Sequence, residues 1–242
     1  MRVFLLFFSA LLLSSGPAPA APPSPVPEPS AARNSPAIVV GFVGGFIKRD
    51  DMVHSGVQLA AILKAEYASG VHVEVFENHR GDDAHAAVLH LLDANGDGKL
   101  SAEERRGARI VIYGHSWGAS EAVALARRLG KDGVPVLLTI QVDSVQKFGE
   151  DDSMIPTNVV QAANFYQADG LLHGRAEIRA EDASRTEILG NFRSSYKEHA
   201  LTCDGYPLFA SIFEKPHIEI ECDPNVWNQV GSLIRSKLPP RF

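Results

Sequence analysis

The chain has 242 residues, of which 45% are hydrophobic and 21% are charged. This length and composition are typical of a globular protein with one full hydrophobic core. The formal net charge is −6 and no stretch concentrates basic residues, which argues against nucleic acid as a partner.

The first residues predict a secretory signal peptide over residues 1–20. Arg2 precedes an apolar run from Val3 to Leu13, and a small-residue cleavage site follows at Ala18-Pro19-Ala20. The run is too short for a permanent membrane anchor, and no later stretch is apolar enough to cross a membrane. Residues 21–36 are rich in Pro, Ala and Ser and predict an extended linker. We therefore expect a secreted or periplasmic product whose folded domain covers residues 37–242.

The first part of this domain alternates between strand and helix patterns. Residues 37–43 form an apolar, branched run that predicts a buried strand, and residues 71–77 alternate like a second strand. Helical spacing covers residues 55–67, where Ser55 is suited to cap the helix, and residues 82–92.

The stretch "DANGDGKLSAEE", residues 93–104, resembles a single EF-hand-type calcium loop. Carboxylate and amide ligands stand at the first, third, fifth and twelfth positions, a glycine at the sixth, a carbonyl donor at the seventh, and a serine suited to bind through water at the ninth. In order, these residues are Asp93, Asn95, Asp97, Glu104, Gly98, Lys99 and Ser101. Hard oxygen ligands at this spacing fit Ca²⁺. The alternative is an acidic, glycine-rich surface turn without metal.

The second part of the domain continues the alternation. Strands are predicted over residues 108–114, 134–142 and 158–167, and a helix over residues 120–130, ending at Gly130. Strands separated by helices imply right-handed crossovers, so the fold class is α/β, with a mostly parallel sheet and helices on both faces. Residues 170–196 contain short alternating stretches, which we interpret as a lid or a hairpin.

The pentapeptide Gly114-His115-Ser116-Trp117-Gly118 lies between a predicted strand and a predicted helix. This arrangement resembles the nucleophile elbow of the α/β-hydrolase superfamily, in which flanking glycines permit a strained turn that exposes the serine. The resemblance implies a minimal α/β-hydrolase fold with Ser116 as nucleophile and the calcium loop inserted before the nucleophile strand. The alternative is a chance match in an exposed loop.

The superfamily places its base after the nucleophile and the acid, on a loop just before the last helix. Of the later histidines, His173, His199 and His217, this position indicates His217 as the base. His199 is the alternative. His217 as an ordinary surface histidine also remains open.

The acid is expected at the carboxyl end of a strand that follows the nucleophile helix. Asp143 ends the strand over residues 134–142, so its carboxylate should emerge at the same sheet edge as Ser116. Asp169 is the main alternative, followed by Asp151 or Asp152, and an Asp in this position can also simply cap a turn.

The resemblance also implies backbone donors for an oxyanion. One donor would come from Trp117, the residue after the nucleophile, and the other from Val43 or Gly44 in the loop after the first strand. The glycines at 41, 44 and 45 would alternatively only form a turn. They do not match a dinucleotide-binding fingerprint, so no organic cofactor is expected.

Cys203 and Cys222 are the two cysteines of the chain. In an exported protein a single pair most simply forms one disulfide, which would close a loop of about 20 residues around His217. Two reduced, buried thiols are the alternative.

Together these patterns predict a secreted serine hydrolase that cleaves a small-molecule or lipid carboxylic ester, as esterases, lipases and thioesterases do. Calcium would be structural, because the nucleophile strand separates the loop from Ser116. The alternatives are a non-catalytic calcium-binding protein on a hydrolase scaffold, and an acyltransferase or peptidase that uses the same triad. The sequence does not indicate an oligomeric state.

Overall fold

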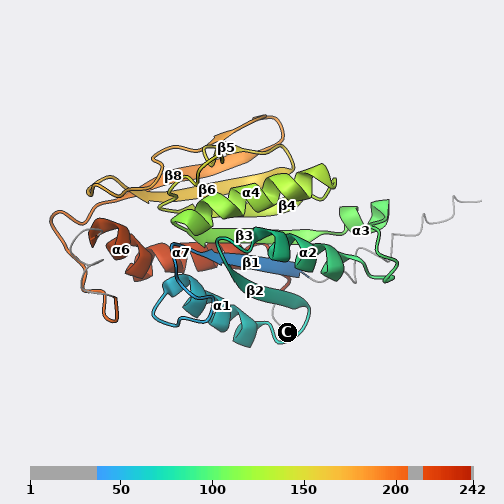
Figure 1. The fold of residues 1–242 in the computed structure, drawn as a ribbon, viewed down its shortest axis with the longest axis horizontal. Helices are drawn as coiled ribbons and strands as arrows, with labels where there is room; N and C mark the ends of the chain where they lie inside the picture. Colours follow the sequence, from blue (N-terminus) through green and yellow to red (C-terminus); the bar gives the residue numbers. More distant parts are fainter. Residues whose placement is uncertain (1–36, 207–214, 241–242) are drawn as a thin grey trace, which may run out of the picture.

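The central element of the fold is a parallel sheet of six strands in the order β2-β1-β3-β4-β6-β8 (Figure 1). The computed structural model describes residues 37–206 and 215–240, so the predicted signal peptide and linker lie outside the described residues. The strands of this sheet are β1 (Ala37–Val43), β2 (Val71–Glu77), β3 (Arg109–His115), β4 (Val136–Val142), β6 (Val159–Gln167) and β8 (Glu187–Ser194). Every pairing between neighbouring strands is parallel.

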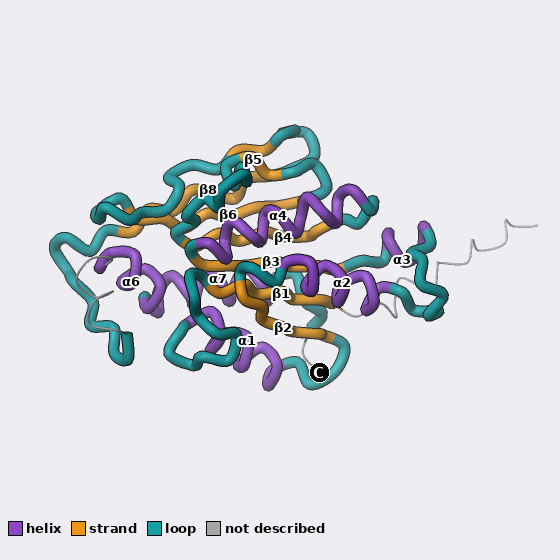
Figure 2. Tube along the Cα trace, viewed as in Figure 1, coloured by secondary structure: helices purple, strands orange, loops and turns teal. Residues whose placement is uncertain are grey.

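Helices cover both faces of the sheet (Figures 1 and 2). On one face, α2 (Gly81–Leu92) and α4 (Trp117–Lys131) bury apolar side chains against the strands. On the other face, α1 (Ser55–Glu66), α6 (Lys215–Cys222) and α7 (Pro224–Arg235) contribute to a second apolar cluster. The short helix α3 (Ala102–Arg106) precedes β3. The predicted α/β class, with a mostly parallel sheet between two helical layers, is therefore confirmed.

The prediction for residues 170–196 is wrong in part. Residues 187–194 form β8, a parallel edge strand of the main sheet, and neither a lid nor a hairpin. The two-residue strands β5 (Met154–Ile155) and β7 (Arg179–Ala180) pair with each other in a separate sheet. The connection from β6 to β8 has no helix among the described residues, so the usual signal of a parallel crossover is missing.

Two helix ends also differ from the prediction. Helix α4 begins at Trp117, directly after the serine, and Gly130 lies inside it; the left-handed backbone conformation that follows the helix belongs to Gly133, with φ of 72°. At α1 the N-cap is His54 and not Ser55. The side chain of His54 makes no capping hydrogen bond, and the backbone N–H of Ser55 donates to Glu221, at 3.0 Å.

No helix among the described residues combines the length and the apolar character needed to cross a membrane.

Candidate active site

Ser116 occupies a sharp turn between β3 and α4. Its backbone has φ of 57° and ψ of −127°, a conformation that non-glycine residues rarely adopt. The two flanking glycines are required by close backbone contacts: a side chain on Gly114 would overlap the carbonyl of Gly118, and one on Gly118 would overlap the carbonyl of Phe42. The sequence pattern thus corresponds to a real strand–turn–helix elbow with Ser116 at its tip.

His217 and Asp143 are brought together from distant parts of the chain. His217 Nδ1 lies 2.6 Å from Asp143 Oδ2, and both residues are buried. Because an ionised carboxylate only accepts, Nδ1 carries the proton in this contact, which leaves Nε2 free to act as a base.

Asp143 is held by backbone and side-chain donors on both of its carboxylate oxygens. Its Oδ1 accepts from the backbone N–H groups of Gln167 (3.1 Å) and Gly174 (2.7 Å), and its Oδ2 also accepts from Gln167 Nε2 at 2.8 Å. The residue itself has a positive φ of 44° at the end of β4. These contacts fix the carboxylate in place to orient the imidazole of His217.

The expected position of His217 on a loop is wrong. His217 is the third residue of α6, a short helix that precedes the last helix α7. Pro216, with its fixed φ and missing N–H, is compatible with the first turn of a helix.

The alternative acids and base lie in other surroundings. Asp169 accepts from Ser195 Oγ at 2.7 Å and from the backbone N–H of Tyr196 at 2.8 Å, and these hydrogen bonds hold its pKa below the usual value. Asp151 accepts from Ser153. His199 is exposed on a loop.

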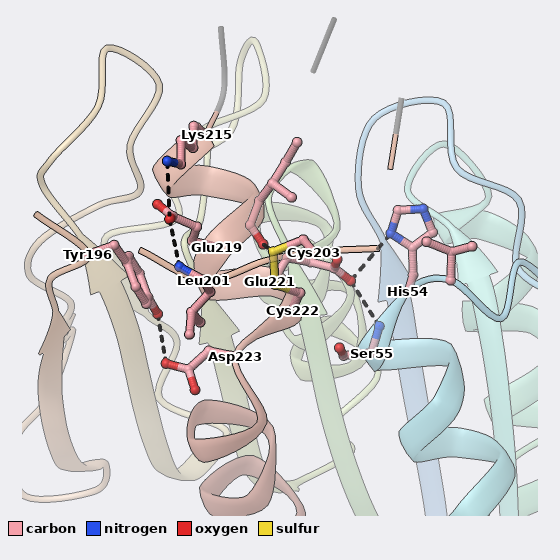
Figure 3. The surroundings of a disulfide bond; sticks show 12 residues. His54, Ser55, Tyr196, Leu201, Cys203, Lys215, Glu219, Glu221, Cys222 and Asp223 are labelled. Atoms are coloured by element: carbon pink, nitrogen blue, oxygen red, sulfur yellow. Dashed lines mark hydrogen bonds and ion pairs between the residues drawn. A yellow bond between two sulfur atoms is a disulfide. The ribbon is translucent and has the colours of Figure 1, made fainter. Parts of the chain in front are cut away.

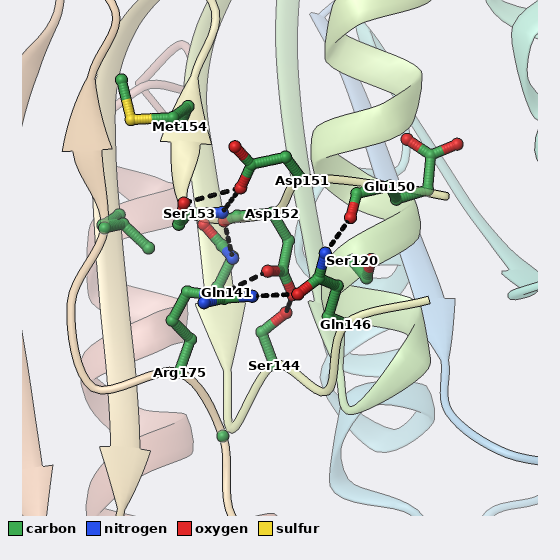
Figure 4. A network of polar contacts seen from close by, with 12 residues as sticks. Ser120, Gln141, Ser144, Gln146, Glu150, Asp151, Asp152, Ser153, Met154 and Arg175 are labelled. Carbon is green, nitrogen blue, oxygen red and sulfur yellow. Dashed lines mark hydrogen bonds and ion pairs between the residues drawn. The ribbon is translucent and has the colours of Figure 1, made fainter. Parts of the chain in front are cut away.

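Asp152 belongs to a buried polar network with Ser144 and Arg175 (Figure 4). Its carboxylate accepts from Ser144 Oγ at 2.5 Å and from Arg175 Nε at 2.7 Å. The backbone N–H of Arg175 also donates to the carbonyl of Ser144, at 2.9 Å. Because Gly174 precedes Arg175, this network fixes the segment whose N–H binds Asp143.

Ser116 and His217 line the same pocket, of about 840 Å³. Among the described residues, no hydrogen bond joins the Ser116 hydroxyl to His217. Hydrogen bonds of this kind are often long or poorly aligned before a substrate binds.

Two of the predicted oxyanion donors, Trp117 and Gly44, line this pocket, and Val43 does not. A side chain on Gly44 would approach Ser116 Cβ to 2.7 Å and the carbonyl oxygen of His115 to 2.9 Å, so the backbone of Gly44 packs directly against the serine. Trp117 is the first residue of α4, and its N–H therefore has no acceptor within the helix. Val43 lies in β1, paired in register with Glu77 of β2, and is less suited than Gly44 to face a substrate.

His115 is a further pocket residue, which the sequence reasoning did not single out. Its ring lies 4.6 Å from that of His217, centroid to centroid, at 32° between planes. Burial, with a smaller contribution from the neighbouring His217, lowers the pKa of His115 well below its usual value. A neutral His115 therefore packs against the imidazole of His217.

The predicted calcium loop connects α2 to α3, so a helix lies on each side of it. The first-position carboxylate, Asp93, accepts from the backbone N–H of Gly98 at 2.8 Å. Glu104 forms a capping box: its oxygens accept from the N–H groups of Ser101 (2.7 Å) and Ala94 (2.9 Å), and the hydrogen bonds with Ser101 lower its pKa. Within residues 37–206 and 215–240, no group of three or more His, Cys, Asp and Glu side chains is arranged to hold a metal ion.

The oxygen-donor set of this loop nevertheless fits Ca²⁺ chemically. To close a site, Glu104 would have to exchange its two N–H donors for the ion. Calcium binding therefore remains a prediction.

Cys203 and Cys222 form the predicted disulfide, with 5.9 Å between their Cα atoms (Figure 3). Cys222 is the last residue of α6, the helix that carries His217. The same helix is held by Glu219, which accepts from the backbone N–H of Leu201 at 3.0 Å, close to Cys203.

Comparisons with known proteins found no matching family model and no matching curated protein. Several solved structures are similar in fold. A thermostable esterase from Pseudomonas putida is 12% identical, with 88% of this chain and 77% of that chain covered and a TM-score of 0.45. A thioesterase of the prodiginine pathway from Streptomyces coelicolor is 10% identical, with 89% and 97% covered and a TM-score of 0.42. A cutinase-like protein from Cryptococcus sp. is 12% identical, with 84% and 94% covered and a TM-score of 0.41. At these identities and TM-scores, the likeness does not define a function for this chain.

Proposed function

We propose that the protein is a secreted serine hydrolase that cleaves carboxylic esters with the triad Ser116, His217 and Asp143. The observation that carries the proposal is the juxtaposition of a strained, elbow-bound serine with a histidine that is oriented by a buried aspartate. A histidine–aspartate pair with a purely structural role would not require a serine at a positive φ in the same pocket.

In the proposed reaction, Ser116 Oγ attacks the carbonyl carbon of the ester while its proton passes to His217 Nε2. The oxyanion that forms accepts hydrogen bonds from the N–H groups of Trp117 and Gly44, and the N-terminus of α4 favours its negative charge. The C–O bond to the alcohol then breaks, and the leaving oxygen takes the proton from His217. Water, activated by the same base, adds to the acyl carbon and releases the acid and free Ser116.

The proposal includes a structural Ca²⁺ held by Asp93, Asn95, Asp97, Glu104 and the carbonyl of Lys99. The ion would brace the connection between α2 and β3 and supply no chemistry, because β3 runs from this end of the sheet to the serine at the other end (Figure 1). Seven residues of strand span roughly 20 Å. The disulfide agrees with an oxidising, extracytoplasmic location, which we propose together with cleavage of the signal peptide.

The test is hydrolysis of p-nitrophenyl butyrate by the purified protein and by the Ser116→Ala variant. We expect turnover by the parent and its loss in the variant, with thermal unfolding of the two proteins alike. Equal turnover in both, or none in a folded parent offered esters of several chain lengths, would contradict the proposal.

A further inference from the structure

The pocket that contains Ser116 has a second polar group on another side. We call the polar wall the four side chains of Asp51, His54, Tyr206 and Glu221, all of which line this pocket. His54 Nδ1 lies 3.3 Å from Glu221 Oε1, and His54 Nε2 lies 3.8 Å from Asp51 Oδ2. Tyr206 packs edge-on against His54, with 5.1 Å between ring centroids.

Glu221 is an unusual component of this wall, because its side chain is 3% exposed. Burial raises the pKa of Glu221, and no lysine or arginine is paired with it among the described residues. A buried carboxyl group needs hydrogen-bond partners on both oxygens to offset the cost of desolvation.

Part of the role of Glu221 is structural. Its Oε1 accepts from the backbone N–H of Ser55 at 3.0 Å and faces His54, so it caps the N-terminus of α1 from α6 (Figure 3). This contact links α1 to the helix that carries His217. These contacts involve only Oε1 and leave Oε2 of Glu221 without a partner among the described residues.

Besides His54 Nδ1, which faces Glu221, two buried polar atoms of the wall have no hydrogen-bond partner among the described residues. They are Glu221 Oε2 and the hydroxyl of Tyr206. Leaving such groups unsatisfied destabilises the folded state, so native proteins usually provide a partner from water or a ligand. Glu221 Oε2 is an acceptor or, when the carboxyl group is protonated, a donor. The hydroxyl of Tyr206 is both a donor and an acceptor.

The remaining lining of the pocket is largely apolar. Phe46 and Trp117 pack edge-on at 5.9 Å between centroids, and Ile47, Val145 and Leu172 also line the pocket. An acyl chain would bury its carbons against these side chains. The polar wall is then left for the alcohol part of an ester.

We propose that the polar wall binds a free hydroxyl group on the alcohol part of the substrate, so that the enzyme prefers esters of polyols, such as glycerol or a sugar, over esters of simple alkanols. A hydroxyl group both donates and accepts, which matches the mixture of Glu221 Oε2, Tyr206 Oη and the imidazole of His54. This inference rests on the proposed ester hydrolase activity and adds a substrate class to it.

The experiment compares kcat/KM for glyceryl monobutyrate and for butyl butyrate, which share the acyl group and differ in the free hydroxyls. The variants are Tyr206→Phe, which removes one hydroxyl group, and Glu221→Gln, which keeps an acceptor for the Ser55 N–H and replaces Oε2 by an NH₂ group. Tyr166→Phe, on β6, is the matched control for loss of a tyrosine hydroxyl outside the pocket.

We expect the parent to prefer glyceryl monobutyrate, and the ratio of the two kcat/KM values to fall about tenfold in each wall variant, mainly through KM for the glyceryl ester. Tenfold corresponds to about 1.4 kcal/mol, the size of one hydrogen bond. The ratio should stay at the parental value in Tyr166→Phe. A purely structural role would change both substrates equally and follow the melting temperature.

A ratio that is unchanged in both wall variants would overturn the proposal. A parent that prefers butyrylcholine over both esters would also overturn it, because the wall would then bind an ammonium group. A parent that cleaves p-nitrophenyl butyrate and shows no preference between the other two esters would contradict the proposed role of the polar wall and leave the proposed hydrolase activity standing. A parent that cleaves none of these esters would contradict the proposed function itself.

Discussion

Asp143→Asn is the substitution that most specifically probes the orientation of His217. Asp143 receives two donors on each oxygen: backbone N–H groups of Gln167 and Gly174 on Oδ1, and the side-chain nitrogens of Gln167 and His217 on Oδ2. An asparagine has only one oxygen, so its NH₂ group must face two of these donors. The backbone donors cannot rotate away, and the oxygen will therefore stay with them.

The NH₂ group of the substituted side chain would then face His217 Nδ1, which must become an acceptor. The proton of the imidazole moves to Nε2, the nitrogen that has to accept the proton of Ser116 in the proposed reaction. The wrong tautomer of the catalytic histidine lowers kcat by about 10⁴-fold in serine proteases with a Ser-His-Asp triad. The lost acceptor should destabilise the fold by about 1–3 kcal/mol, or roughly 2–12 °C in melting temperature.

The assay is steady-state hydrolysis of p-nitrophenyl butyrate at a temperature where both proteins are folded. Asp169→Asn is the matched control, because that carboxylate also accepts two hydrogen bonds, from Ser195 and Tyr196, without facing a histidine. We expect the control to retain kcat within about threefold, since no catalytic orientation depends on it. If Asp143→Asn keeps kcat within about tenfold of the parent, the role given to Asp143 is refuted.

Three further outcomes follow from other parts of the molecule. Gly44→Ala should lower kcat by about 10²-fold or more and change the melting temperature little, since its new Cβ would lie 2.7 Å from Ser116 Cβ. An unchanged kcat would exclude this segment from the oxyanion site. Cys203→Ser should lower the free energy of unfolding in urea by about 3 kcal/mol, because it opens the disulfide-closed loop that contains His217. A variant as stable as the parent would show that the disulfide does not stabilise the fold. Chelation of calcium should release the ion from the loop over residues 93–104 and lower the melting temperature by a few degrees. At temperatures where the protein stays folded, kcat should be unchanged. A loss of turnover in folded protein would assign the ion a role in the active site.

The sequence predicts the parts of this fold that combine strong burial with simple periodicity. Strands β1, β3 and β4 are apolar runs buried on both faces, and their patterns allow few other interpretations. Asp143 was predictable for a related reason: the end of a buried strand places its carboxylate at the edge where Ser116 also emerges. In these cases the local pattern and the tertiary position agree.

Local sequence patterns do not predict the elements whose structure depends on tertiary contacts. Strand β8 is half-exposed at the sheet edge and has no helical crossover, so nothing local distinguishes it from a hairpin. The sequence of α6, "KPHIEIEC", alternates like a strand, yet it forms a helix held by Cys203 and by Ser55. The polar wall was not foreseen, because His54 and Glu221 belong to opposite ends of the domain and meet only in the folded chain.

Covalent labelling shows directly whether Ser116 is the nucleophile. The purified protein would be treated with a fluorophosphonate, with calcium and with chelator, and digested for peptide mapping by mass spectrometry. We predict a single adduct on Ser116 in both conditions, and none when Asp143→Asn or Ser116→Ala is labelled for the same short time. An adduct on another residue, or an unlabelled Ser116 in a folded parent, would contradict the assignment of this pocket as the active site of a serine hydrolase.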